Sequence, residues 1–133
     1  MLTIGHVASR TGLRPSAIRY YEAQGLLRRP ARLGGKRVYP PSVFEQLAII
    51  EMAKIAGFSL GDIRRLIADA GASGAGNAWS RLIPARAAEV DEEMKRLLAI
   101  KAVLSKLNTC RCATLDECGR AFVEVQHRGT LDA

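Results

Sequence analysis

The residues of this chain best suited to chemistry are three cysteines near its C-terminal end. Cys110, Cys112 and Cys118 are the only cysteines present, and they follow a C-x-C-x5-C spacing. Thiolates are soft ligands for ions such as Zn(II), Hg(II) and Pb(II), and they also react with oxidants. Residues two apart do not share a helix face, but they point the same way in an extended segment. The spacing therefore predicts that the chain leaves a helix here so that the thiols converge on one centre.

The next residues predict how the third thiol reaches that centre. Thr114-Leu115-Asp116-Glu117 matches a capping box, so we expect a short helix with Cys118 in its first turn. A helix N-terminus also favours thiolate over thiol. A structural zinc site uses four N or S ligands, in which case His127 or water would supply the fourth. Three thiolates alone suit Hg(II) or Pb(II).

Composition indicates a folded protein outside membranes. The chain has 133 residues, of which 48% are apolar, which fits one domain or a small domain with an extension and excludes wholesale disorder. No apolar run approaches the roughly 20 residues of a membrane span, and the N-terminus lacks the pattern of a signal peptide. We therefore expect a cytoplasmic protein with no membrane partner. Thiols are kept reduced there, which favours a metal or redox role over a disulfide scaffold.

Positive charge is concentrated at the N-terminal end. Residues 1–39 hold eight Lys or Arg against one acid, Glu22, so this segment carries all of the net charge of +7. The remainder holds 12 residues of each sign and is neutral. A basic N-terminal segment, called the head below (residues 1–39), followed by a neutral remainder favours nucleic-acid binding over the alternative of a solvated basic surface.

The basic head has the pattern of a helix-turn-helix. Thr3 is suited to cap a first helix that ends at Gly12, and Pro15 is suited to the first turn of a second helix that runs to Gly25. In this motif the second helix enters the major groove of DNA. The second helix offers five candidates for DNA contact: Arg14, Ser16, Arg19, Tyr20 and Tyr21. The two tyrosines are expected either to pack or to reach phosphate.

A basic hairpin is predicted after the second helix. The pair Gly34-Gly35 separates two short segments within residues 28–39, which is typical of a β-hairpin. A hairpin beside a recognition helix forms a wing, and Lys36 and Arg37 would then lie on phosphates. Such contacts position a protein on DNA without reading its sequence. Tyr39, at the end of the hairpin, completes the set of candidate DNA-binding residues.

These segments resemble the DNA-binding domain of the MerR family. The resemblance is carried, in order, by Ile18-Arg19-Tyr20-Tyr21-Glu22, by Arg37-x-Tyr39, and by Gly57-Phe58-Ser59-Leu60 with Asp62-Ile63. It covers roughly residues 2–68. It implies a dimeric transcription regulator, not an enzyme, that binds double-stranded promoter DNA with an overlong spacer. In that family the activated form distorts the DNA so that RNA polymerase can use the promoter.

Beyond residue 70 the sequence predicts a linker and then a long helix. Small residues from Gly71 to Gly76 predict a loop over residues 71–79. Apolar residues then recur at alternating spacings of four and three, interrupted by one lysine: Ile83, Ala87, Val90, Met94, Leu97, Lys101 and Leu104. We expect a helix over 80–108 that pairs antiparallel with that of a second subunit. The alternative is packing onto the chain's own core.

Within the MerR family, the tail is most similar to the SoxR-type redox sensors. The three cysteines align with the last three of that group's C-x2-C-x-C-x5-C motif, and Leu107 occupies the position of the first. The resemblance implies a [2Fe–2S] cluster, but such clusters normally need four protein ligands and leucine cannot ligate. Two signals therefore stay open. One is a thiophilic metal ion such as Hg, Pb or Zn, and the other is redox sensing through a cluster or by direct thiol oxidation.

The predicted fold class is mainly α. It comprises a winged helix-turn-helix domain over 1–70, a linker over 71–79, a long antiparallel coiled-coil dimerisation helix over 80–108, and a cysteine-containing loop with a short helix over 109–133. The expected function is regulation of transcription by a homodimer on promoter DNA. We expect its signal to be a thiophilic metal ion at the C-x-C-x5-C site.

Overall fold

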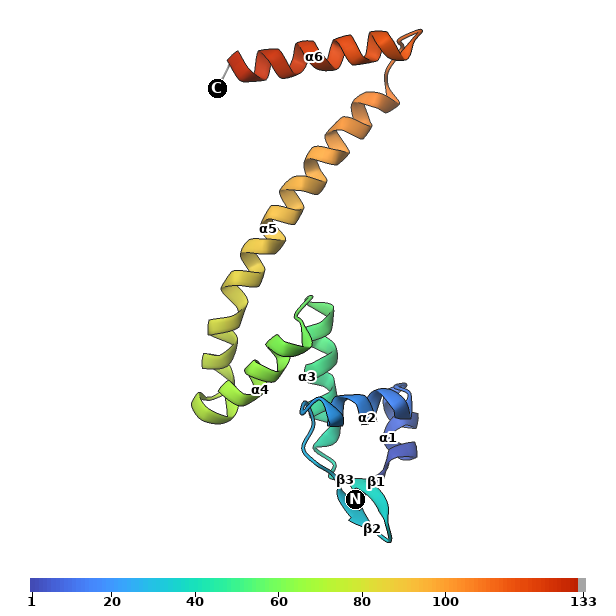
Figure 1. Ribbon diagram of the computed structural model, residues 1–133, viewed down its shortest axis with the longest axis vertical. Helices are drawn as coiled ribbons and strands as arrows, with labels where there is room; N and C mark the ends of the chain where they lie inside the picture. Colours follow the sequence, from blue (N-terminus) through green and yellow to red (C-terminus); the bar gives the residue numbers. More distant parts are fainter. Residues whose placement is uncertain (132–133) are drawn as a thin grey trace. The chain divides into compact units, whose positions relative to one another are not determined.

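The computed structural model describes residues 1–131, which form six helices and three short strands (Figure 1). In chain order the elements are β1 (Leu2–Thr3), α1 (Ile4–Thr11), α2 (Pro15–Ala23), β2 (Ala31–Leu33), β3 (Lys36–Tyr39), α3 (Val43–Ile55), α4 (Leu60–Ser73), α5 (Ala75–Asn108) and α6 (Leu115–Leu131). The predicted mainly α class is confirmed. The chain divides into two units, Met1–Ala88 and Glu89–Ala133, and each is described by itself.

The helix-turn-helix forms where its capping residues predict it. Thr3 precedes α1, and its hydroxyl accepts a hydrogen bond from the His6 N–H at 3.2 Å. Gly12 ends α1 in the left-handed conformation, with a φ of 75° that favours glycine. Pro15 occupies the first turn of α2, where its missing N–H removes no helical hydrogen bond. These signals lie within a few residues of the ends that they define, which is why sequence alone locates them.

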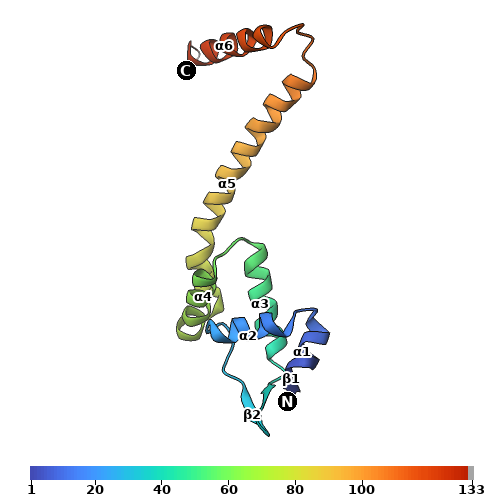
Figure 2. The same cartoon turned by 45° about the vertical axis from the view of Figure 1, so that its right-hand side comes forward.

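The wing is a three-stranded antiparallel sheet in the order β1-β3-β2. Leu33 pairs with Lys36, so Gly34 and Gly35 form a two-residue turn in which both φ angles are positive, at 57° and 80°. That geometry explains the glycine pair and confirms the predicted hairpin. Strand β1 was not predicted, because two residues are too few to show an alternating pattern. In both views the hairpin projects beyond the helices of its unit (Figure 2).

A single apolar core holds the first unit together. Helices α1, α2, α3 and α4 and strand β3 contribute its most deeply buried large side chains: Val7, Ile18, Tyr39, Val43, Leu47, Ile50 and Ile63. Helix α4 begins at a capping box in which the Ser59 hydroxyl accepts from the Asp62 N–H and the Asp62 carboxylate accepts from the Ser59 N–H. This core fixes the angle between α2 and the wing.

We expect Ile50→Ala to lower the free energy of unfolding by about 2–5 kcal/mol, because it removes buried methylene groups and leaves a cavity. Helix α3 supplies a matched control, since Ile50 is 0% exposed and Ile55 is 88% exposed. Ile55→Ala should change stability by less than about 0.5 kcal/mol. Denaturant unfolding of both variants checks this difference, and equal losses would contradict the described core.

The predicted loop over 71–79 is wrong. Helix α4 continues to Ser73 and α5 begins at Ala75, so only Gly74 is non-helical, with φ 92° and ψ 153°. The alanines between the glycines favour helix, and each glycine lowers helix stability by only about 1 kcal/mol relative to alanine. Cross-helix contacts offset that cost, including an ion pair between the Arg81 guanidinium and the Asp69 carboxylate at 2.5 Å.

The long helix also begins earlier than predicted. Its first turns belong to the first unit, where Ala78 is buried and Trp79 packs on Phe58 with ring centroids 6.3 Å apart. The Arg86 Nε donates a hydrogen bond to the Ala56 carbonyl at 2.9 Å. The predicted boundary at residue 80 therefore lies inside a helix whose start stabilises the head, whereas its predicted end at Asn108 is confirmed.

The second unit contains the rest of α5, the cysteine loop and α6. The apolar stripe of α5 lies on the surface here, and Met94, Leu97 and Leu104 are each more than half exposed. The C-terminal helix, with 17 residues, is longer than expected. Across the described residues, no helix is long and apolar enough to cross a membrane.

Candidate metal centre and nucleic-acid interface

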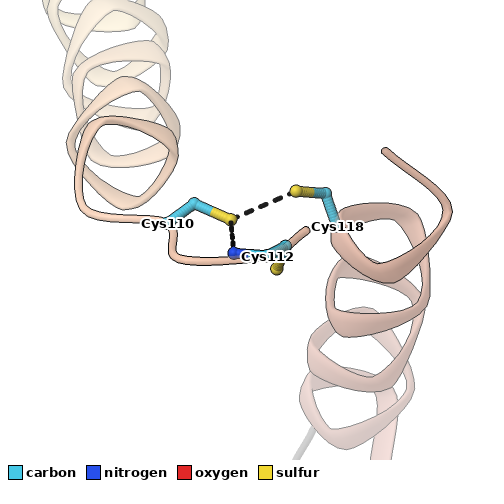
Figure 3. Close-up of side chains that lie close together, drawn as sticks. All are labelled: Cys110, Cys112 and Cys118. Atoms are coloured by element: carbon cyan, nitrogen blue, oxygen red, sulfur yellow. Dashed lines mark hydrogen bonds between the residues drawn. The ribbon is translucent and has the colours of Figure 1, made fainter. Parts of the chain in front are cut away.

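The three thiols meet in the loop between α5 and α6. Their sulfur atoms all lie within 4.8 Å of one another. The Sγ atoms of Cys110 and Cys118 are 3.1 Å apart and point toward one another, and the Cys112 N–H donates to the Cys110 Sγ at 3.4 Å (Figure 3). The convergence predicted from the C-x-C-x5-C spacing is therefore present in the structure.

Local hydrogen bonds explain why the chain turns here. The Cys110 N–H still donates to the Leu107 carbonyl at 3.3 Å, which closes the end of α5. The Thr114 hydroxyl then accepts from the Glu117 N–H at 3.3 Å, as the capping pattern predicts. The Glu117 carboxylate accepts from the Ala113 N–H, one residue before the cap, so only half of the box forms in the standard way. Cys118 lies in the first turn of α6, as expected.

The three thiols differ in pKa because they hydrogen-bond to one another. Hydrogen bonding with the thiol and N–H of Cys112, followed by the Cys118 thiol, lowers the pKa of Cys110. Hydrogen bonding to Cys110 raises the pKa of Cys112 to about 12, and it also raises the pKa of Cys118. A negative charge on the Cys110 sulfur thus disfavours ionisation of a second thiol nearby. A bound cation would supply the opposing charge and favour loss of the remaining protons.

Among the described residues, the cluster that could hold a metal ion consists of the three cysteines, and no histidine or carboxylate belongs to it. His127, the predicted fourth ligand, lies on α6 nine residues after Cys118, which is about 14 Å along a helix axis. Leu107 lies much closer, because it lines the same apolar groove as the three cysteines. The donor set is therefore three sulfur atoms, which fits a soft ion that accepts low coordination numbers.

The candidate DNA-contacting residues separate into exposed and buried sets. Ser16, Arg19 and Tyr20 are exposed on α2, Arg14 is exposed at the N-cap of that helix, and Lys36 is exposed on β3. Arg37 is half-buried, and its Nε lies 3.4 Å from the Glu22 carboxylate. The five exposed side chains come from the two elements expected to contact DNA, namely the recognition helix and the wing.

Two predicted contact residues are core residues. Tyr21 is 4% exposed, and its hydroxyl donates to the Glu51 carboxylate at 2.9 Å while accepting from the Lys54 ammonium at 2.7 Å. Tyr39 is 1% exposed, and its hydroxyl donates to the Glu22 carboxylate at 3.1 Å. Burial and then this hydrogen bond raise the pKa of Tyr39 to about 12, so it remains a donor. Of the two roles expected for Tyr21, the structure supports packing.

Sequence reasoning missed two parts of these sites. The groove beside the thiols contains Phe122 and Val125 of α6, and no motif distinguished them from an ordinary helix stripe. Glu22 was noted as the lone acid of the basic head and as part of the family motif, but not as a structural residue, yet it accepts from both Arg37 and Tyr39. A carboxylate isolated among eight basic residues was the available signal for a structural ion pair.

Comparisons with known proteins agree with this architecture. Residues 2–70 match the model of the MerR HTH family regulatory proteins, and residues 44–107 match the model named MerR, DNA binding. An HTH-type transcriptional activator SoxR homolog of Chromobacterium violaceum is 32% identical over 119 residues, which cover 88% of this chain and 80% of the relative. A mercuric resistance operon regulatory protein of Shigella flexneri is 33% identical over 112 residues, which cover 84% and 76%.

A solved structure extends the likeness to most of the chain. The transcription regulator PbrR691 from Ralstonia metallidurans CH34, crystallised in complex with lead(II), is 30% identical and superposes with a TM-score of 0.67. The match covers 86% of this chain and 91% of that one. The family models, the SoxR homolog and the winged helix-turn-helix all lead to one assignment. The chain belongs to the MerR family of helix-turn-helix regulatory proteins, and it is a DNA-binding transcription regulator rather than an enzyme.

Proposed function

We propose that this regulator binds promoter DNA as a homodimer and responds to a thiophilic metal ion held by Cys110, Cys112 and Cys118. The observation that carries the proposal is the convergence of all three sulfur atoms within 4.8 Å of one another. The relatives include a mercuric resistance regulator and a protein crystallised with lead(II), which supports a soft ion as the signal. Hg(II) and Pb(II) suit three sulfur ligands better than Zn(II), which usually takes four ligands.

The exposed basic surface supports the proposed contacts with DNA. Helix α2 would enter the major groove with Arg14, Ser16 and Arg19, while Lys36 of the wing would lie on phosphate. Tyr20 extends the same exposed surface. Pairing of two α5 helices would present two recognition helices to one DNA face.

The proposed output is activation through the shape of the DNA. The metal-bound dimer would distort a promoter whose spacer is overlong, so that RNA polymerase can engage it. To shift such a two-state equilibrium from 1:99 to 99:1, the ion must favour the active state by about 5.5 kcal/mol. Apparent binding energies of structural zinc sites are about 10–16 kcal/mol, so the switch requires only part of the binding energy to differ between the two states.

Lys36→Ala is expected to weaken binding to all DNA sequences to a similar extent, because a phosphate contact reads no bases. It should also reduce the slope of log affinity against log salt by about one for each subunit bound. Fluorescence anisotropy over a salt series measures both effects. Arg96→Ala removes an exposed charge from α5 and should leave the salt slope unchanged. An unchanged slope for Lys36→Ala would place Lys36 away from phosphate.

Titration of the reduced dimer with Pb(II), Hg(II) and Zn(II) tests the proposed signal. We expect thiolate-to-metal absorption that saturates at one ion per subunit, together with protection of all three thiols from alkylation. Absence of that absorption with every soft ion tried would refute the metal proposal. The readout does not depend on knowing the operator.

A second signal, thiol oxidation, is favoured by the 3.1 Å distance between the Cys110 and Cys118 sulfur atoms. Hydrogen peroxide would accept two electrons and two protons from these thiols, giving a disulfide and two water molecules. The expected pair is Cys110–Cys118, because these sulfur atoms face one another in Figure 3. Mass mapping after peroxide treatment identifies the linked peptides. If the promoter responded more strongly to peroxide than to Pb(II), thiol oxidation rather than metal binding would be the main signal.

Leu107→Cys is expected to strengthen Zn(II) binding at least tenfold, because it adds a fourth thiolate beside the three present. The same variant, reconstituted with iron and sulfide, should hold an iron–sulfur cluster more stably than the natural chain. Competition with a chromophoric chelator and visible absorption measure the two effects. Leu98→Cys adds an exposed thiol elsewhere on α5 and serves as the control. Equal behaviour of both variants would mean that residue 107 does not reach the site.

A further inference from the structure

Two side chains from the first turns of α5 contact the turn between α3 and α4. The Arg86 Nε donates to the Ala56 carbonyl at 2.9 Å, and Trp79 packs on Phe58. Residues 79 and 86 are seven apart, so they share one face of α5 and lie two turns from each other. Ala56 is the C-cap of α3, and a guanidinium is favourable at the negative end of a helix. This contact therefore joins the end of α3 to α5.

Gly57 leaves the space that the guanidinium of Arg86 occupies. A Cβ atom at residue 57 would lie 2.8 Å from the Arg86 Cζ, which is closer than real Cβ atoms approach their neighbours. Gly57 also has a φ of 87°, a conformation that favours glycine. The guanidinium thus lies directly against the backbone of the turn. Such a contact restrains geometry more narrowly than a surface ion pair between two flexible side chains does.

The connection between α4 and α5 depends on this restraint. Gly74 is the one residue between these two helices, so rotation at Gly74 alone would change the angle between them. Arg86 lies about 18 Å from Gly74 along a helix axis, whereas Arg81, which pairs with Asp69, lies about 10 Å from it. A displacement of about 1 Å corresponds to a rotation of about 3° at the first distance and about 6° at the second. Arg86 therefore restrains the angle more tightly than the ion pair.

The same turns of α5 carry the start of the expected dimer seam. Ile83 and Ala87 are the first residues of the apolar stripe, and they lie in the first unit together with Arg86. The angle that Arg86 restrains is thus the angle between the winged helix-turn-helix domain and the seam. In a dimer, this angle decides where the two recognition helices meet DNA. One base pair more or less moves a half-site by about 3.4 Å and turns it by roughly 35° about the DNA axis.

We propose that Arg86 is a positioning residue that sets the separation of DNA half-sites accepted by the dimer. With the contact in place, a half-site displaced by one base pair is reached only by deforming the DNA, which costs free energy. Without the contact, each domain rotates at Gly74 and follows the displaced half-site. This inference rests on the proposed binding to DNA as a homodimer and does not depend on the metal ion.

The test measures binding as a function of half-site separation. Selection from random double-stranded DNA by the reduced, metal-free protein gives the half-sites and their separation. Fluorescence anisotropy then gives the affinity for the selected site and for the same site with one base pair added or removed at its centre. Arg86→Ala removes the contact. Gly57→Asn adds a Cβ atom that displaces the guanidinium, and asparagine tolerates a positive φ better than most residues. Arg96→Ala removes an exposed arginine of α5 and is the matched control.

We expect the natural chain and Arg96→Ala to lose affinity at least about tenfold when the separation changes by one base pair. In Arg86→Ala and Gly57→Asn the same change should cost about threefold or less, because the domains rotate instead of the DNA deforming. If both variants keep the tenfold discrimination, even with a lower affinity at every separation, the proposal is overturned, since Arg86 would then contribute to folding alone. Selection of single half-sites by the natural chain would instead overturn the proposed dimeric binding.

Discussion

Cys118→Ser is expected to lower the affinity of the regulator for Pb(II) by more than about 100-fold and to abolish its transcriptional response to metal. Loss of an outer-shell partner alone typically costs about 10–100-fold in metal affinity, and loss of a sulfur ligand should cost more. A serine hydroxyl is a hard, neutral donor that does not replace a soft thiolate. Competition titration gives the affinity, and transcription from the regulated promoter gives the response.

The controls for Cys118→Ser separate ligation from folding. Ser105→Ala changes an exposed side chain one turn before the loop and should keep both the affinity and the response. DNA binding by metal-free Cys118→Ser should match that of the natural chain, because the first unit has its own core. A Cys118→Ser protein that still responds fully to Pb(II) would show that the three thiols are misassigned.

Leu97→Glu is expected to convert the dimer into monomers and to weaken DNA binding by more than about 100-fold. Leu97 lies in the apolar stripe of α5, and its side chain is 57% exposed in the single chain. A carboxylate there would have to be buried without a partner when two helices pair. A monomer engages only one half-site and loses the effective concentration that the second head provides. Sedimentation and anisotropy measure the two losses.

Ala99→Glu introduces the same charge on the opposite side of α5 and provides the matched control. Because residue 99 projects away from the stripe, the dimer and its affinity for DNA should persist. If both variants remain dimeric, the stripe is not the subunit interface. If both dissociate, the introduced charge acts through the helix itself rather than through one of its faces.

Local signals predicted the DNA-binding head well because its turns depend on residues with special backbone properties. Gly12 adopts a positive φ, Pro15 begins a helix, and Gly34-Gly35 forms a two-residue turn. Each constraint acts within a few residues, so no knowledge of distant contacts is needed. The convergence of the thiols was predictable for the same reason, since a C-x-C pair cannot share a helix face.

Features that depend on distant contacts escaped prediction. Helix persists through the glycine-rich segment after residue 70 because α5 packs back on the head through Trp79 and Arg86. Tyr21 packs in the core, and its hydroxyl hydrogen-bonds with Glu51 and Lys54, which lie thirty or more residues away in the sequence. Residue type alone does not distinguish an aromatic side chain that stacks on DNA from one that fills a core.

The groove beside the thiols illustrates the same limit at the candidate site. Leu107 was noted as the residue in place of a fourth ligand, and the structure shows in addition that it lines the apolar groove beside the thiols. Phe122 carried no signal in the sequence, because a helix stripe in α6 looks the same whether it meets a core or lines a groove. Only the fold brings the soft ligands and the apolar surface together.

X-ray absorption at the lead edge of the Pb(II)-loaded dimer identifies the atoms that hold the ion. We expect one lead ion per subunit with three sulfur neighbours and no nitrogen neighbour, since the cluster contains no histidine among the described residues. The sulfur count should fall to two in Cys118→Ser. A coordination shell of oxygen or nitrogen alone, unchanged by that substitution, would contradict a regulator that senses soft metal ions through Cys110, Cys112 and Cys118.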